Sequence, residues 1–116
     1  IGPSSILLAL MASGLGGQRF AFHGYLPAKE PERSQSIRDL EKTARRDRAT
    51  QLFIETPYRS AALLDALATS LAPDTFISVG ADLSLPGQLI QTRRAKSWRG
   101  HAESVKDRLV VFGIGI

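Results

Sequence analysis

Hydrophobic and polar positions in the middle of the chain predict a buried strand, a sharp turn and an amphipathic helix. Leu52–Ile54 form a short apolar run with the composition of a strand inside a sheet. Thr56 and Pro57 then suit a helix start, because a hydroxyl can accept a backbone N–H and the proline ring fixes φ near its helical value. Leucines follow at three- and four-residue steps, at Leu63, Leu64, Leu67 and Leu71. Glu55 and Arg59 remain at the strand-to-helix corner, where open α/β sheets present ligand-contacting residues.

The pattern of hydrophobic and polar positions before and after this central segment predicts further strands and helices. Strands are expected at 19–25, 75–80, 89–95 and 109–114, and helices at 5–13 and 31–45. Gly14 suits a left-handed cap at the end of the first helix, and Gly24 suggests a bulge in the first strand. Strands that alternate with helices and end in a hairpin-like pair indicate an α/β domain, with a mixed sheet of about five strands and helices packed on it.

Length and composition narrow the class of protein. A chain of 116 residues, 43% hydrophobic and 22% charged, is expected to fold as one globular domain. The absence of cysteine excludes disulfides, thiolate metal ligands and a cysteine nucleophile. No apolar run has the length of a membrane span, so we expect no membrane partner. The chain opens at Ile1 without a methionine and is interpreted as a fragment of a longer protein.

The basic residues of the chain are clustered. The net charge is +4, and residues 93–108 carry six basic and two acidic side chains. Such a cluster can bind phosphates, with an affinity that falls as salt rises. Trp98 lies within it and could stack a nucleic-acid base. The alternative, which we favour, is a solvated basic surface with Trp98 as a core or interface anchor.

Motifs that would define a reaction by themselves are missing. The glycines at 14–17 follow a predicted helix, whereas a dinucleotide fingerprint follows a strand and opens a helix. His23 has no second ligand at metal-binding spacing, so a structural histidine is expected and no metal site. There is no P-loop, no supported Ser-His-Asp arrangement and no carboxylate pair that spacing would place together. Spacing alone therefore indicates an α/β domain with polar residues at strand ends.

Four segments in order resemble the C-terminal half of the tetrapyrrole methylase superfamily, which uses S-adenosylmethionine. The first comprises residues 2–5 together with residues 12–15, at the end of the predicted helix that follows. The other three are FHGYLPAK at 22–29, ETPYR at 55–59 and ADLSLPGQ at 81–88. The second and third segments look closest to the branch of ribosomal RNA small subunit methyltransferase I, which methylates a ribose 2′-hydroxyl of a cytidine in 16S rRNA. The resemblance implies a two-domain fold, of which residues 1–116 are the C-terminal domain and the N-terminal domain is absent from this chain.

The resemblance also implies a cofactor, partners and site residues. The cofactor would be S-adenosylmethionine in the cleft between the domains, and the protein a cytoplasmic homodimer. Its expected contacts with this chain are at Ser4, Ser5, Glu55, Leu83 and Gly113. Lys29 and Arg59 match positions near the substrate and are the candidate catalytic residues. The isolated chain is expected to be inactive, because half of the cofactor cleft would be missing.

Two alternatives stay open beside this interpretation. The ribosomal branch usually has an Arg-Glu pair where this chain has Ala81 and Asp82, and the loss of an arginine removes a bidentate partner for phosphate or carboxylate. A tetrapyrrole precursor is therefore an alternative substrate. A non-catalytic dimerisation or RNA-binding module of the same fold is the second alternative. For Glu55 and Arg59, a local ion pair that stabilises the helix start is as compatible with the sequence as a functional role.

Overall fold

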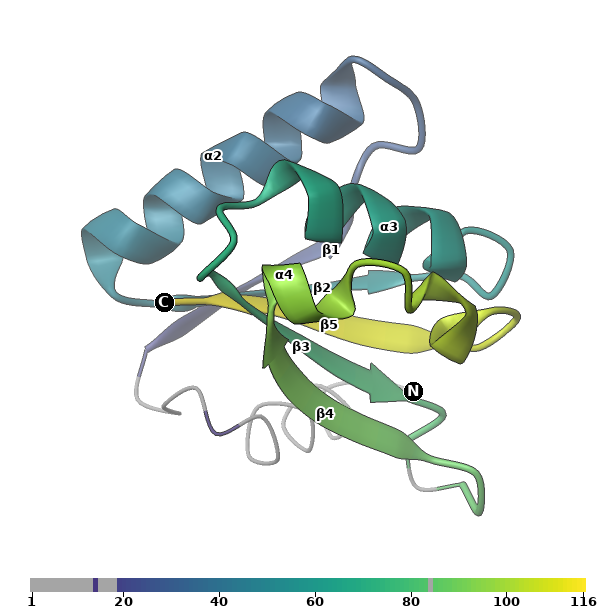
Figure 1. Cartoon of the computed structure of the whole chain (residues 1–116). Coiled ribbons are helices and arrows are strands. Elements are labelled where there is room, and N and C mark those ends of the chain that lie inside the picture. Colours follow the sequence, from purple (N-terminus) through teal and green to yellow (C-terminus); the bar gives the residue numbers. More distant parts are fainter. Residues whose placement is uncertain (1–13, 15–18, 84) are drawn as a thin grey trace.

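The computed structural model describes residue 14 and residues 19–83 and 85–116, and shows a mixed five-stranded sheet with helices on one face (Figure 1). The expected helix at 5–13 and the predicted contacts at Ser4 and Ser5 lie outside the described residues. The elements in chain order are β1 (Phe20–Tyr25), α2 (Glu32–Asp47), β2 (Thr50–Glu55), α3 (Ser60–Ser70), β3 (Phe76–Ala81), β4 (Leu89–Arg94), α4 (Ala95–Trp98), a 3-10 turn (Ala102–Val105) and β5 (Val110–Gly115).

The order of the strands is β1-β2-β5-β3-β4, so the last strand lies in the centre of the sheet. β1 and β2 pair in parallel, and the other three pairs are antiparallel. The predicted α/β mixed sheet is confirmed, but the terminal hairpin-like pair is wrong, because the hairpin is formed by β3 and β4. All six residues of β5 are buried, and a strand buried in this way needs a hydrogen-bonding neighbour on each side.

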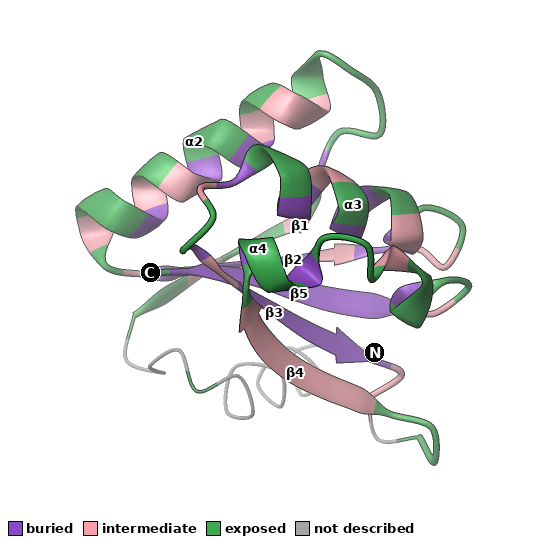
Figure 2. Ribbon diagram, in the orientation of Figure 1, coloured by how far each residue is buried: buried purple, intermediate pink, exposed green. Residues whose placement is uncertain are grey.

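The core lies between the sheet and the helices that cover one of its faces (Figure 2). Phe53 of β2 stacks on Phe112 of β5 with ring centroids 5.7 Å apart. The four leucines that predicted the central helix are all buried, at Leu63, Leu64, Leu67 and Leu71. The expected apolar stripe of α2 is buried as well, at Ile37, Leu40 and Ala44. The sequence pattern therefore identified the packed faces of both helices correctly.

The central helix begins later than its sequence predicts. Its N-cap is Arg59 and its first residue is Ser60, so Pro57 belongs to the preceding turn. That turn is closed by the Arg59 backbone N–H, which donates to the Thr56 carbonyl at 3.1 Å. The Ser60 hydroxyl lies within hydrogen-bond distance of the same carbonyl, at 2.8 Å. Because this carbonyl is used by the turn and by Ser60, the chain enters the helix only after Arg59.

Two glycines have the backbone conformations that the sequence predicts. Gly24 has a φ of 69°, and the pairing of β1 with β2 shifts register between Phe22 and Tyr25, which confirms the bulge. Gly14 has a φ of 71°, as a left-handed cap requires.

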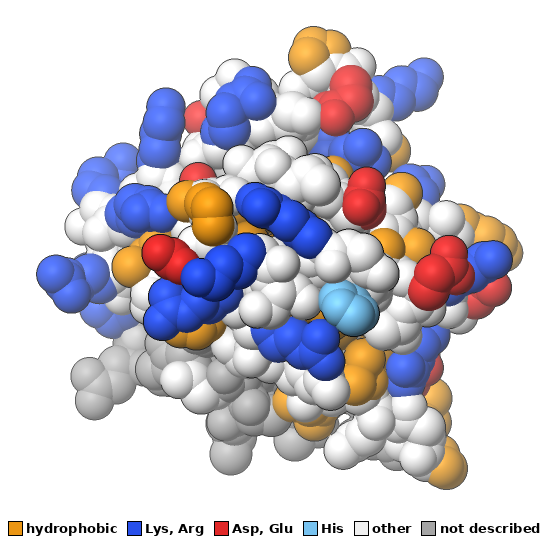
Figure 3. Space-filling view, viewed as in Figure 1, with side chains coloured by type: hydrophobic (Ala, Val, Ile, Leu, Met, Phe, Trp, Pro, Cys, Tyr) orange, Lys and Arg blue, Asp and Glu red, His pale blue; other side chains and the backbone are white. Residues whose placement is uncertain are grey.

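Trp98 is a core residue, which confirms the interpretation that we favoured. Its ring is buried, and its Nε1 donates to the Ile77 carbonyl at 2.9 Å. The Arg93 guanidinium covers the ring at 4.7 Å from the centroid. A ring that is packed in this way has no face free for a base. Nearby, Arg94 and Lys96 both pair with Asp74, and Figure 3 shows acidic side chains among the basic ones on this side of the molecule.

We expect Trp98→Phe to lower the free energy of unfolding by about 1–3 kcal/mol, because the Ile77 carbonyl loses a donor and the core loses volume. Urea unfolding followed by circular dichroism measures this change. Tyr58→Phe is the matched control, since Tyr58 is 91% exposed, and it should leave the midpoint unchanged. A Trp98→Phe midpoint equal to that of the wild type would show that the indole is not a structural anchor.

Candidate functional site at the carboxyl ends of three strands

The carboxyl ends of β1, β2 and β3 meet at one edge of the sheet. β1 runs parallel to β2, and β5 is antiparallel to both β2 and β3, so β2 and β3 run in the same direction. Glu55 pairs with Val110, which pairs with Ala81 on its other side. The turns that follow the three strands therefore lie at the same edge, which is where sheets of this kind bind ligands. This edge carries the corner at 55–59 and the loop at 82–88.

The corner after β2 is organised by the Glu55 carboxylate. Its side chain is only 3% exposed, and Oε1 accepts from the Thr56 backbone N–H at 2.8 Å and from Arg59 Nε at 3.2 Å. The Arg59 side chain is 46% exposed. The local ion pair that the sequence left open is thus present, and it orients a half-exposed guanidinium at the edge.

The Thr56 hydroxyl does not have the role that the sequence predicted for it. The pattern predicted that its hydroxyl caps the helix, but Oγ1 is buried and has no hydrogen-bond partner. A buried hydroxyl without a partner costs about 1–3 kcal/mol. The atom has almost no surface open to solvent, so a ligand can reach it only if the corner rearranges. No feature of the sequence signals the unpartnered hydroxyl, because Thr before Pro is an ordinary helix start.

The loop after β3 contains Leu83, which is half-buried in a turn. Its neighbour Asp82 has a φ of 50°, and the Asp82 backbone N–H donates to the Leu109 carbonyl at 3.0 Å. Arg108 Nε donates to Asp82 Oδ2 at 2.7 Å. Asp82 is therefore paired with an arginine from the segment before β5. Sequence reasoning missed this contact, because 26 positions separate the two residues.

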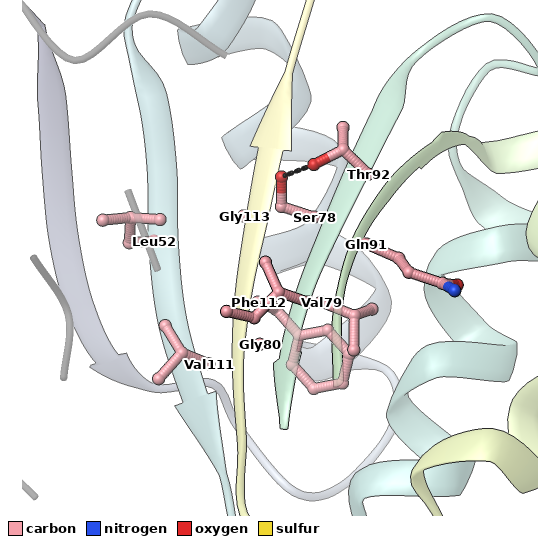
Figure 4. Close-up of a pocket in the computed structure, with 10 residues that line it drawn as sticks. Leu52, Ser78, Val79, Gly80, Gln91, Thr92, Val111, Phe112 and Gly113 are labelled. Atoms are coloured by element: carbon pink, nitrogen blue, oxygen red, sulfur yellow. Dashed lines mark hydrogen bonds between the residues drawn. The ribbon is translucent and has the colours of Figure 1, made fainter. Parts of the chain in front are cut away.

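Gly113 lies in the interior of the sheet and not at this edge. It pairs with Leu52 and Ser78, three residues along β5 from Val110, or about 10 Å at the rise of a strand. It lines a cavity of about 10 Å³, close to the minimum for one water molecule. Figure 4 shows it among the other residues that line this cavity. A Cβ at Gly113 would meet Leu52 Cδ2 at 3.2 Å, so the strand is closely packed here. The structure does not group Gly113 with Glu55 and Leu83.

Lys29 and His23 complete the residues that the sequence singled out. Lys29 follows β1 and is exposed, and its side chain makes no hydrogen bond or ion pair with the described residues. Topology places it at the same edge as Arg59, with no contact between the two side chains. His23 Nε2 lies 2.6 Å from Gln51 Oε1, a contact between strands that fits a structural histidine. Across the described ranges, no three potential metal ligands gather in one place.

Several curated relatives of the chain are named ribosomal RNA small subunit methyltransferase I. The protein from Mesorhizobium japonicum is 32% identical over 113 residues, which is 95% of this chain and 37% of that protein. The protein from Vibrio cholerae is 31% identical over 78% of this chain and 30% of its own length. The protein from Xylella fastidiosa is 42% identical over 59% of this chain and 23% of its own length. The chain thus spans about a third of the length of the first two relatives.

The fold has a counterpart among solved structures. The crystal structure of the methyltransferase CobJ matches 95% of this chain and 46% of its own, with a TM-score of 0.60 and 21% identity. At this identity the match shows the fold alone. A scan against models of protein families finds no match. The relatives carry the name of the branch that the sequence resembles, and the solved structure has the same fold. The resemblance stated from the sequence is confirmed, and the relatives are methyltransferases that need a methyl donor. In the ranges that the structure describes, no helix has the length and apolar character to cross a membrane.

We expect Arg59→Ala to lower the free energy of unfolding by about 1–2 kcal/mol, because the buried Glu55 carboxylate loses a charged donor that is itself partly screened by solvent. Chemical denaturation of Arg59→Ala, Glu55→Gln and the double variant measures the coupling between the two residues. The loss caused by Arg59→Ala should be smaller in the Glu55→Gln background. An equal loss in both backgrounds would mean that the ion pair does not stabilise the corner.

Proposed function

We propose that this chain is the C-terminal domain of an S-adenosylmethionine-dependent methyltransferase that methylates a ribose 2′-hydroxyl of 16S rRNA. The observation that carries the proposal is the similarity over 95% of the chain to a ribosomal RNA small subunit methyltransferase I. The edge formed by β1, β2 and β3 supports it, because it gathers the corner and the loop to which the resemblance assigns cofactor contacts.

The described residues fit a bound methyl donor at this edge. The backbone at Glu55 and Leu83 can contact the adenosine. In this proposal the corner rearranges on binding, so that the buried Thr56 hydroxyl, which has no partner in the protein, takes one more hydrogen bond. Ser4, Ser5 and Gly113 remain predicted contacts. S-adenosylmethionine supplies a methyl group already activated by the sulfonium, so the protein has to align the acceptor and exclude water.

Arg59 and Lys29 are proposed to act on the acceptor. Arg59 is half-exposed beside the corner, with its Nε fixed by Glu55, so the rest of its guanidinium can orient a phosphate or stabilise the oxygen as it loses its proton. Lys29 is an exposed cation at the end of β1 and can contribute in the same way. Both roles concern charge and orientation, and neither needs a covalent intermediate.

The proposed function also includes an oligomeric state and a cellular location. We propose a homodimer in the cytoplasm, as the resemblance implies. A tetrapyrrole precursor is the alternative substrate. Its support in the sequence is the missing arginine, and Arg108 does not replace that arginine, because its donor groups bond to Asp82, Ser104 and Gly87.

The experiment is methyl transfer by the protein of the full reading frame. Labelled S-adenosylmethionine is incubated with small ribosomal subunits that lack this methylation, and in parallel with a tetrapyrrole precursor. Label in 16S rRNA, at a ribose, is the expected result. Label in the tetrapyrrole alone would overturn the substrate and keep the methyl donor. No label in either, with no binding of S-adenosylmethionine, would indicate the non-catalytic module.

We expect Thr56→Val to weaken binding of S-adenosylmethionine by about 2- to 12-fold, the equivalent of one hydrogen bond, without lowering thermal stability. Valine keeps the shape of threonine and removes the hydroxyl that has no partner in the protein. Calorimetric titration and a melting curve of the same sample measure both quantities. Unchanged affinity with unchanged or increased stability would show that the hydroxyl does not contact the methyl donor.

A further inference from the structure

Arg108 joins three separate segments through one side chain. Its Nε donates to Asp82 Oδ2 at 2.7 Å, and its Nη2 donates to the Gly87 carbonyl. Its Nη1 donates to the Ser104 carbonyl at 3.3 Å. Asp82 and Gly87 lie near the two ends of the loop after β3, so one guanidinium fixes both ends of that loop. A lysine has no planar fork and cannot donate to three acceptors in these directions.

The backbone of Arg108 reaches the corner after β2. Its carbonyl accepts from the Ser60 hydroxyl at 2.7 Å, and the same hydroxyl is 2.8 Å from the Thr56 carbonyl. Ser60 is fully buried. Arg108 is therefore connected through its side chain to the loop after β3 and through its main chain to the corner.

The loop itself has the form of consecutive turns. The Leu85 backbone N–H donates to the Asp82 carbonyl, and the Gln88 backbone N–H donates to the Leu85 carbonyl, both at 3.0 Å. Asp82 has a left-handed φ of 50°, which an aspartate tolerates better than most residues. Leu83 follows directly, so the direction of its backbone depends on how Asp82 is held.

The charged contact is partly shielded from solvent. The Arg108 side chain is 24% exposed and that of Asp82 is 28% exposed. A charge-assisted bond at 2.7 Å with this burial is stronger than an exposed ion pair on the surface. Arg94 and Asp74 show the contrast, because they are 3.6 Å apart and 48% and 72% exposed.

We infer that Arg108 is a positioning residue for the methyl donor: it holds the loop after β3 against the corner after β2, so that Leu83 and Glu55 face the same ligand. This inference rests on the proposed function. Arg108 does not touch the reacting atoms. Its loss frees the loop, so the affinity for S-adenosylmethionine falls while turnover at saturating cofactor changes less.

The test uses the protein of the full reading frame with Arg108→Lys, Asp82→Asn and the double variant. Arg94→Lys is the matched control, because it alters an arginine–aspartate pair at the opposite end of β3 and β4. Titration with S-adenosylmethionine gives Kd, steady-state methyl transfer gives KM and kcat, and melting gives stability. We expect Arg108→Lys to raise Kd and KM by about tenfold with a kcat within about threefold of the wild type, and Arg94→Lys to change neither.

The double variant shows whether Arg108 acts through Asp82. Its Kd should lie close to that of Arg108→Lys alone, since both changes break the same contact. An Arg108→Lys protein that melts at a lower temperature but binds S-adenosylmethionine like the wild type would reduce Arg108 to a structural role and overturn the inference. A wild type that binds no S-adenosylmethionine would refute the proposed function, and the inference with it.

Discussion

The central position of β5 is the constraint on which the rest of the structure depends. All six of its residues are buried, and the strand pairs with β2 on one side and β3 on the other, both antiparallel. Since β5 runs against both neighbours, β2 and β3 must run in the same direction, and their carboxyl ends lie at the same edge. A terminal hairpin of β4 and β5 would have left β3 without this neighbour. The placement of the last strand thus creates the edge at which the candidate site is built.

The position of β5 also determines where Arg108 lies, and Arg108 contacts the loop after β3. Arg108 lies immediately before β5, so the position of the strand places the guanidinium beside the loop after β3. The corner after β2 is held by contacts between residues close in sequence, because the Glu55 carboxylate accepts hydrogen bonds from Thr56 and Arg59. The two loops are held by different ion pairs, and the one Ser60 hydroxyl lies between the carbonyls of Thr56 and Arg108, within hydrogen-bond distance of both. The described residues of the corner and of the loop are thus held by contacts within the protein.

Features set by neighbouring residues could be predicted from the sequence, and features set by distant ones could not. The leucine spacing of α3, the bulge at Gly24 and the core role of Trp98 each follow from local pattern or composition. The start of α3 was misplaced because the turn before it uses the Thr56 carbonyl instead of the hydroxyl.

Contacts between residues far apart in the sequence could be identified only from the three-dimensional structure. Nothing in the run 93–108 distinguishes Arg108 from the arginines that pair elsewhere, and no local pattern shows that β5 returns to the centre of the sheet. The candidate site was predicted in part: the resemblance pointed to Glu55, Arg59 and Leu83 together, whereas it gave no sign that Gly113 would lie about 10 Å away along its strand.

The most direct test of this account is a structure of the protein of the full reading frame with S-adenosylmethionine bound. The account predicts that the adenosine lies against the edge formed by the strand ends, in contact with the backbone at Glu55 and Leu83, with Arg108 still joined to Asp82. A cofactor bound away from both loops, or an Arg108 that has released Asp82 in the complex, would contradict it.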